Sequence, residues 1–513
     1  MTQRVAGSGA GAGSAETPLM QQYREIKARH PQAILFFRMG DFYEMFEDVA
    51  RVAARDLGLT LTSRNNGGAA EVPLAGVPVK AATEYLRRLI AKGHRVAICD
   101  QVEDPKLAKG VVRREVVETV TPGTVLTDDW LARNRNNYLV AIAPRGAAAG
   151  IAALDVTTGE LVLEVVPPAE LGAALARYEA LEIVVPAGAG TIAAGATVTE
   201  REAWEFDAEL AREDLTRTFG LASLDGLGIG TDDRPAVGAA GALLRYAREL
   251  KPGGLPHLAR PTLVRRGDVL PLDEMTRRNL ELVEPLAAGA QGATLLETLD
   301  RTLTPMGGRL LRRWILAPLV DPAAINARLD AVEVLVGDGR GRERLREALD
   351  GVRDLERLAG RAALGRATPR ELGALRDSIL RLPDTRGALN GVEGRGRAAS
   401  LEAAALGFDL LADLGEELGR ALVDRPPAQL ADGDAIRPGY DRELDELKDA
   451  RDGGKRYIAS LQARERERTG IGSLKVGYNR VFGYYIEVTH AHRARVPSDY
   501  ERRQTLTGAE RYV

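Results

Sequence analysis

The sequence predicts a multidomain protein that combines mixed α/β domains with an all-α region and a β-rich end. Its 513 residues are too many for one hydrophobic core, so several domains are expected. Short apolar runs alternate with amphipathic helical patterns as far as about residue 255, which is typical of α/β domains. From about residue 268 the patterns are almost wholly helical, and after Gly470 they return to strands.

Composition excludes several classes of protein. No apolar run reaches the roughly 18 residues of a membrane-spanning helix. The Gly-, Ala- and Ser-rich stretch 1–16 lacks the apolar segment of a signal peptide, so a flexible tail is expected there. Cys99 is the single cysteine, which excludes a disulfide framework and a CxxC metal site and favours a cytoplasmic location. The net charge of −3 means that any basic surface for nucleic acid is local.

Residues 17–127 predict one mixed α/β unit. Thr17 and Pro18 form a typical helix start, with Thr at the N-cap and Pro in the first turn. The apolar run AILFF, residues 33–37, predicts a short buried strand. A further helix ends near Gly93, and strand-like sequence follows. The unit has 16 Lys and Arg against 13 Asp and Glu, a net charge of 16 − 13 = +3.

The stretch FFRMGDFYEMFEDVA, residues 36–50, joins the expected strand to the next helix. Asp41 and Glu44 have the spacing of the N-cap and N3 positions of a capping box. The pattern therefore predicts that Phe42 is the first residue of a helix that Gly58 ends. On that pattern Phe42 is most simply a core residue, although a ring at the first helical position can also point off the end of the element.

Residues 135–255 predict a second α/β domain, with a strand turn at Thr158 and Gly159 and a cluster of chain breakers at 251–257. Residues 268–455 predict a helical domain, in which Asp321-Pro322 is a clear helix start. Apolar residues between 440 and 461 recur at a heptad-like spacing, which predicts one helix of about 30 residues and roughly 45 Å.

Residues 456–513 predict a β-rich end with a basic tip. Two strand-like runs flank Tyr478-Asn479-Arg480, which is expected to be a turn. Between 455 and 513 there are 12 Lys and Arg against 6 Asp and Glu, a net charge of 12 − 6 = +6. Such a tip can contact phosphates; a solvated hairpin with ordinary surface charges is the simpler alternative on charge alone.

Several long motifs, in the same order, resemble the MutS family of bacterial DNA mismatch-recognition proteins. The motifs are FFRMGDFYEMFEDVA, EVPLAGVPVKAATEYLRRLIAKGHRVAICDQVEDP, VTPGT, LDRTLTPMGGRLLRRWILAPL, RLDAVEVL, ERERTGIGSLKVGYNRVFGYYIEVT and RRQTLTGAERYV. The resemblance covers nearly everything from about residue 17 to the end. It implies a mismatch-binding domain at 17–127, a ribonuclease H-like connector at 135–255, a helical core with long lever helices at 268–455, and a clamp at 456–513.

The resemblance also implies site residues and overturns the core interpretation of Phe42. In the family's Phe-x-Glu motif, here Phe42-Tyr43-Glu44, the Phe is a wedge inserted at the mispair and the Glu contacts the displaced base. Candidate contacts to the rest of the duplex are Met39, Arg64, Pro73, Leu74, Lys80, Arg113, Arg114, Lys475, Asn479, Arg480, Arg502 and Arg503.

The partners implied are duplex DNA with mispairs or small loops, a second copy of the chain, and a MutL-type repair protein, in a cytoplasmic, nucleoid-associated setting. The family ends in an ATPase domain that requires a GxxxxGK[ST] loop, and this sequence contains no such stretch. ATP and Mg²⁺ are therefore expected only for that domain, and no cofactor or ATPase activity is expected of this chain alone. The chain is expected to be truncated within a helix that returns from the clamp, at RRQTLTGAERYV.

Two other classes of function stay open. Asp155, followed by a Thr-Thr-Gly turn and Glu160, suggests a ribonuclease H-like nuclease, but two-metal chemistry needs more carboxylates at one place. The long helices and the near-neutral charge are also compatible with a helical scaffold that binds no DNA.

Overall fold

The computed structural model describes residues 17–66, 69–103, 110–126, 130–190, 195–287, 294–479 and 483–513. The tail expected at 1–16 lies outside these ranges. The chain divides into two compact units, residues 1–415 and 416–513. Within the described ranges, no helix combines the length and the apolar character needed to cross a bilayer.

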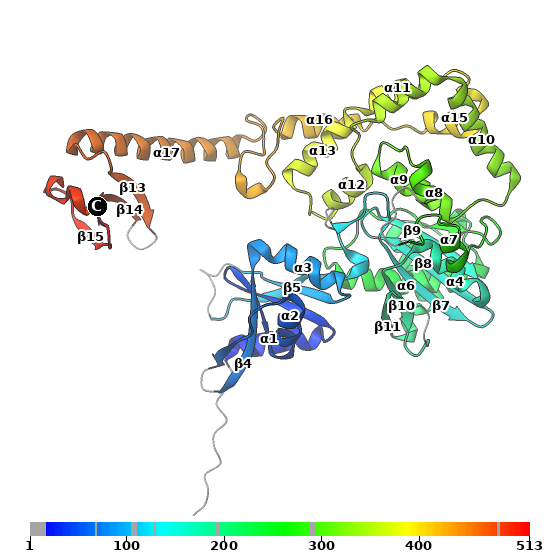
Figure 1. Ribbon diagram of the computed structural model, residues 1–513, viewed down its shortest axis with the longest axis horizontal. Coiled ribbons are helices and arrows are strands. Elements are labelled where there is room, and N and C mark those ends of the chain that lie inside the picture. Colours follow the sequence, from blue (N-terminus) through cyan, green and yellow to red (C-terminus); the bar gives the residue numbers. More distant parts are fainter. Residues whose placement is uncertain are drawn as a thin grey trace, which may run out of the picture. The chain divides into compact units, whose positions relative to one another are not determined.

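The first sheet of the larger unit, in the blue tones of Figure 1, has six strands in the order β3-β4-β2-β1-β5-β6. β1 and β5 run parallel, and the other neighbours are antiparallel. Its strands are β1 (Ala33–Met39), β2 (Phe42–Phe46), β3 (Thr62–Asn66), β4 (Ala69–Pro78), β5 (Arg95–Gln101) and β6 (Arg114–Val120).

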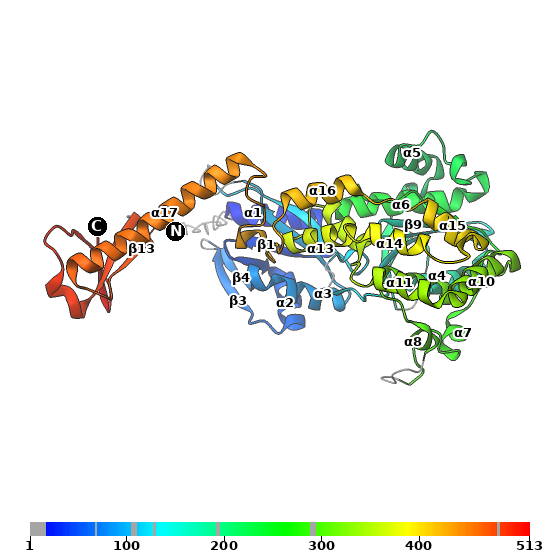
Figure 2. The ribbon, with the colours of Figure 1, turned by 90° about the horizontal axis from the view of Figure 1, so that it is seen from above.

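Helices cover both faces of this sheet (Figure 2). On one face α1 (Pro18–Arg29) packs with Phe37 and Phe46. On the other face α2 (Glu47–Leu57) and α3 (Ala82–Ala91) pack with a second apolar cluster. The predicted helix start at Thr17-Pro18 and the predicted strand at 33–37 are confirmed.

The segment from 40 to 47 differs from its prediction. Phe42 begins strand β2 after a two-residue turn in which Gly40 has a φ of +57°, and helix α2 begins only at Glu47. The predicted capping box of Asp41 and Glu44 is therefore wrong. The short apolar run fits the period of a helix as well as that of a strand. The turn decides between the two, because Gly at its first position lets the chain reverse directly into an antiparallel strand.

A second six-stranded sheet has the order β11-β10-β7-β8-β9-β12. α4 covers one face, and α5 and α6 cover the other (Figure 2). The predicted turn at Thr158-Gly159 joins β8 to β9, with Gly159 at a φ of +80°. The elements are β7 (Tyr138–Arg145), β8 (Ala148–Asp155), β9 (Glu160–Val166), α4 (Leu171–Tyr178), β10 (Glu182–Pro186), β11 (Thr197–Arg201), α5 (Ala208–Phe219), α6 (Arg234–Leu250) and β12 (Thr262–Val264).

The rest of the larger unit is helical. Asp321 caps α10 as predicted, because its carboxylate accepts hydrogen bonds of 3.1 Å from the amides of Ala323 and Ala324. The helices are α7 (Glu274–Asn279), α8 (Leu295–Leu299), α9 (Pro305–Leu316), α10 (Pro322–Gly337), α11 (Gly339–Leu349), α12 (Leu355–Ala363), α13 (Pro369–Ile379), α14 (Leu382–Asn390) and α15 (Ala399–Leu406). The next helix, α16 (Ala412–Ala421), spans the boundary between the two units.

The smaller unit is built on the long helix α17 (Arg442–Thr469), orange in Figure 1. Its length of 28 residues confirms the predicted long helix. The end of α17 packs on a sheet of order β13-β14-β16-β15; there Arg466 Nε donates to the carbonyl of Leu474 at 2.7 Å. The strands are β13 (Lys475–Asn479), β14 (Gly483–Thr489), β15 (Arg502–Thr505) and β16 (Ala509–Tyr512).

In the smaller unit, one expectation from the sequence is wrong and another can be tested only in part. The last residues form β15 and β16, so the expected returning helix at 502–513 is wrong. They pair with β14 and with each other, and this pairing uses their backbone groups. The expected turn at 478–480 is only partly visible, because β13 continues to Asn479 and residues 480–482 lie outside the described residues.

Candidate nucleic-acid interface

Phe42 stands apart from the other phenylalanines of the first sheet. Its side chain is 46% exposed, whereas Phe36, Phe37 and Phe46 are at most 1% exposed. The residue lies at the start of β2, directly after the turn, and pairs with Met39 at the end of β1. A large apolar ring is thus held at the tip of a hairpin whose other end is anchored in the core.

Glu44 lies on the same face of β2 as Phe42, because side chains two residues apart share a face of a strand. It is half-buried. Its neighbours across the sheet are Phe37 in β1 and Gly76 in β4. Gly76 has no side chain, and a Cβ at position 76 would lie 3.8 Å from Cγ of Glu44 and from Cδ1 of Phe42.

Arg114, the first residue of β6, contacts the end of β1 next to this hairpin. Its side chain is only 6% exposed, and Nε and Nη1 donate to the carbonyls of Arg38 at 2.7 Å and Val112 at 2.8 Å. Nη2 lies 3.6 Å from the Sδ atom of Met39. Burial lowers the pKa of Arg114, and the charge of Glu44 acts in the opposite sense. Its guanidinium is already bound within the protein, so we do not retain Arg114 as a phosphate contact.

The opposite face of β2 is fixed by Tyr43. Its hydroxyl donates to Asp100 at 3.0 Å, and the guanidinium of Arg38 lies over its ring, 5.5 Å from the centroid. Burial, reinforced by the charge of Asp100, raises the pKa of Tyr43 to about 12. Sequence reasoning did not select these three residues as part of the site. No local sequence pattern links Tyr43 to Asp100, because the two residues are 57 positions apart.

The other candidates of the first sheet lie in varied settings. Lys80 is exposed, just after Val79, whose amide donates to the carbonyl of Asp41 at 2.9 Å. Arg113 is exposed and paired with Glu115. Half-buried candidates are Pro73, Leu74 and Met39. The side chain of Arg64 lies outside the described residues.

The predicted DNA contacts of the smaller unit differ in their surroundings. Lys475 is exposed at the start of β13. Arg502 lies 3.4 Å from Glu510, and Arg503 lies 3.0 Å from Glu501, so each of these two cations is partly neutralised. The predicted contacts Asn479 and Arg480 have side chains outside the described residues.

Comparison with protein-family models assigns almost the whole chain. MutS domain I matches residues 17–129, MutS domain II matches 137–259, MutS domain III matches 275–471, and MutS family domain IV matches 439–513. This chain belongs to the MutS family. Phe42 and Glu44 therefore lie in MutS domain I.

Named relatives agree. The chain is 46% identical over 510 residues to the DNA mismatch repair protein MutS of Solibacter usitatus, with 97% of this chain and 58% of the relative covered. It is 46% identical to the protein of the same name from Pelotomaculum thermopropionicum, with 96% and 58% covered, and 42% identical to that of Halothermothrix orenii, with 97% and 56% covered. The chain thus spans a little over half the length of these relatives.

Asp155, in the segment matched by MutS domain II, stabilises the connection between two strands. Its side chain is fully buried, and it accepts hydrogen bonds from Asn136 Nδ2 at 2.9 Å, the Asn137 amide at 3.1 Å and the Thr157 hydroxyl at 2.6 Å. The carboxylate ties the start of β7 to the end of β8. Among the described residues, no cluster of three metal-binding side chains occurs.

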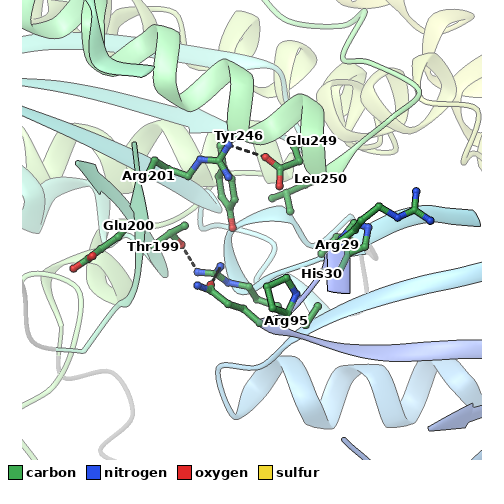
Figure 3. Close-up of a pocket in the computed structure, with 13 residues that line it drawn as sticks. Arg29, His30, Arg95, Thr199, Glu200, Arg201, Tyr246, Glu249 and Leu250 are labelled. Carbon is green, nitrogen blue, oxygen red and sulfur yellow. Dashed lines mark hydrogen bonds and ion pairs between the residues drawn. The ribbon is translucent and has the colours of Figure 1, made fainter. Parts of the chain in front are cut away.

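A cavity of about 190 Å³ lies between residues of MutS domains I and II. Figure 3 shows Arg95 of β5 reaching Thr199 of β11, and Arg201 paired with Glu249 of α6. The contact of Arg95 with Thr199 joins the two sheets of the larger unit, whereas Arg201 and Glu249 lie on the same side of the cavity, in β11 and α6. Because its arginines already have partners in the protein, we regard the cavity as a joint and not as a DNA-binding site.

Proposed function

We propose that this chain recognises mispaired or looped base pairs in duplex DNA as the first step of mismatch repair, with Phe42 as the wedge and Glu44 as the base contact. The observation that carries the proposal is the exposed ring of Phe42 at the tip of the β1–β2 hairpin, beside a half-buried carboxylate on the same face. The names of the relatives point to the same process.

The physical basis is the ease with which a mispair is unstacked. An apolar ring inserted between base steps replaces the broken stacking and fixes a kink, which is cheapest where the duplex is already deformable. The ring must be held firmly to do this. Phe42 meets that requirement, because the next side chain, Tyr43, is anchored by Asp100 and Arg38 on the opposite face.

Glu44 contributes to the preference for mispaired over matched DNA and not to the affinity for DNA as such. A carboxylate near a duplex is repelled by phosphates, so its presence weakens binding to matched DNA. When a base is displaced, the carboxylate can accept a hydrogen bond from the base edge. The pair of residues therefore favours the mispaired duplex partly by penalising the matched one.

The remaining domains take the roles that the family resemblance implies. The segment 135–255 would be a ribonuclease H-like connector, the helices of 268–455 the core and lever, and the segment 456–513 a clamp that uses Lys475, Arg502 and Arg503 on phosphates. Dimerisation, a MutL-type partner, and ATP with Mg²⁺ in a further domain are expected of the longer relatives and are proposals for this chain.

The test compares binding of the chain to a G·T duplex and to its matched A·T counterpart at one salt concentration. We expect tighter binding to the G·T duplex. In Phe42→Ala the preference should fall toward unity, because a stacked aromatic contributes about 1–3 kcal/mol, or about 5- to 150-fold. Phe46→Leu, which alters a buried ring on the same strand, is the matched control. Equal binding of both duplexes by the unaltered chain would refute the proposal.

A further inference from the structure

Gly76 is the position where β4 faces the two proposed reading residues. In the register of β2 and β4, Gly76 lies opposite Glu44, and Pro78 lies opposite Phe42. A Cβ built on Gly76 would lie 3.8 Å from Cγ of Glu44, 3.8 Å from Cδ1 of Phe42 and 3.6 Å from the carbonyl oxygen of Tyr43. A side chain at this position would therefore project between Phe42 and Glu44.

The fold itself gives no reason for glycine here. The three distances are ordinary van der Waals contacts, and the φ of Gly76 is not in the left-handed region. Gly150 is different, because a Cβ there would lie 2.0 Å from the backbone of Pro235. Glycine inside a strand also weakens the strand and often marks a close approach by another molecule. The absence of a side chain at position 76 thus needs an explanation outside the packing.

The position of Gly76 beside both residues suits the approach of a nucleobase edge. Phe42 and Glu44 are two residues apart on one strand, so their Cα atoms are separated by about 6.5 Å. A base stacked on the ring of Phe42 must pass over position 76 for its polar edge to meet Glu44. The backbone of β4 at Gly76 forms the floor of that path, and Phe42 and Glu44 form its two sides.

We propose that Gly76 is a specificity-determining residue, whose missing side chain leaves a notch between Phe42 and Glu44 for the edge of a displaced nucleobase. The inference rests on the proposed function and deepens it. Phe42 supplies the stacking surface, Glu44 supplies the hydrogen-bond acceptor, and Gly76 makes it possible for one base to reach both.

The experiment measures binding of Gly76→Ala and Gly76→Val to three duplexes: a G·T mispair, the matched A·T pair, and an abasic site. The abasic duplex is flexible and can accept the wedge, but it has no base to place in the notch. We expect the mispair preference to fall stepwise from glycine to alanine to valine at this position, with at least a tenfold decrease for Gly76→Val. Binding to the abasic duplex should stay within twofold of the unaltered chain.

Controls separate this inference from its alternatives. Gly172→Ala, where a new Cβ meets no atom within 4 Å, should leave binding of all three duplexes unchanged; because Gly172 lies in α4, alanine there should not lower the melting temperature. A melting curve of each Gly76 variant checks the fold. An unchanged mispair preference in Gly76→Val overturns the notch while leaving the Phe42 wedge intact. Equal decreases on the mispaired and abasic duplexes also overturn it, because the variant would then disturb the wedge itself. If the unaltered chain shows no mispair preference, the proposed function fails first.

Discussion

The guanidinium carbon of Arg114 lies 5.0 Å from the ring centroid of Phe37, and Phe37 is the residue directly opposite Glu44 in the sheet. A buried cation thus contacts the aromatic ring that pairs with Glu44, the proposed base contact. Together with its bonds to the carbonyls of Arg38 and Val112, this places Arg114 in the support of the hairpin. The sequence had suggested a phosphate contact instead.

Arg114→Lys should therefore reduce stability, and Arg114→Gln, which removes the charge, should leave the salt dependence of DNA binding unchanged. A lysine cannot reproduce the forked set of hydrogen bonds, and buried acceptors without partners cost about 1–3 kcal/mol each. Chemical denaturation of both proteins measures the change in stability. The matched control is Arg113→Lys at the neighbouring exposed position, which should have little effect. A weaker salt dependence in Arg114→Gln, with stability unchanged, would restore Arg114 as a phosphate contact.

Tyr43→Phe should lower stability near neutral pH, and the difference from the unaltered chain should shrink in alkali. The hydrogen bond to Asp100 that the variant removes is worth about 0.5–1.5 kcal/mol. The pKa of Tyr43 is raised to about 12, so between pH 10 and 12 the unfolded chain releases this proton while the folded chain keeps it. Stability from Tyr43 is therefore lost as pH rises above 10, by about 0.8 kcal/mol at pH 10.5. Denaturation at pH 8 and pH 10.5 provides the comparison, and a difference that grows with pH would contradict the assignment.

Glu44→Gln should tighten binding to matched DNA more than to mispaired DNA, so that the ratio of the two affinities shrinks. The structure removes the competing explanation, because Glu44 lies within β2 and cannot stabilise a helix start. Binding of G·T and A·T duplexes at one salt concentration gives the ratio. Glu84→Gln on α3 removes an exposed charge from the same domain and serves as the control. If both variants change the ratio equally, only net charge is involved.

The basic groups of the smaller unit should govern the salt dependence of binding to any duplex. Removing one phosphate-binding cation lowers the slope of log K against log salt by about 0.9. We expect Lys475→Gln and Arg503→Gln to reduce the slope and to weaken matched and mispaired duplexes equally. Arg442→Gln removes the same charge at the start of α17 and should leave the slope unchanged. A constant slope in all three variants would show that the tip is only a solvated hairpin.

Much of the fold could be predicted from local signals. The start of α1 at Pro18, the cap of α10 at Asp321 and the long α17 follow from residues close in sequence. The hairpin at Gly40 could not be predicted in the same way. Phe42, Met45 and Phe46 fit a helical period as well as a strand, and only their tertiary partners in β1 and β4 decide between the two.

In the candidate site, too, local sequence patterns predict less than the contacts between distant residues decide. The importance of Phe42 and Glu44 was inferred from the family resemblance, and residue patterns alone favoured a core residue and a helix cap. Arg114, Tyr43 and Asp100 support the hairpin through contacts between residues 57 or more positions apart, so no local pattern reveals them. Gly76 carries no side chain, and its relation to Phe42 exists only through strand pairing.

The position of Phe42 at a mispair can be measured with a photoreactive phenylalanine analogue, p-benzoylphenylalanine, at position 42, whose crosslinks are mapped along a duplex with one G·T pair. If Phe42 is the wedge, crosslinks should be concentrated at the mispair and its adjacent step, with none above background on the matched duplex. The same analogue at position 204, where Trp204 is exposed in the segment matched by MutS domain II, should show no such concentration. Crosslinks from position 42 spread evenly along the duplex, or absent from the mispair, would contradict the assignment of Phe42 as the wedge.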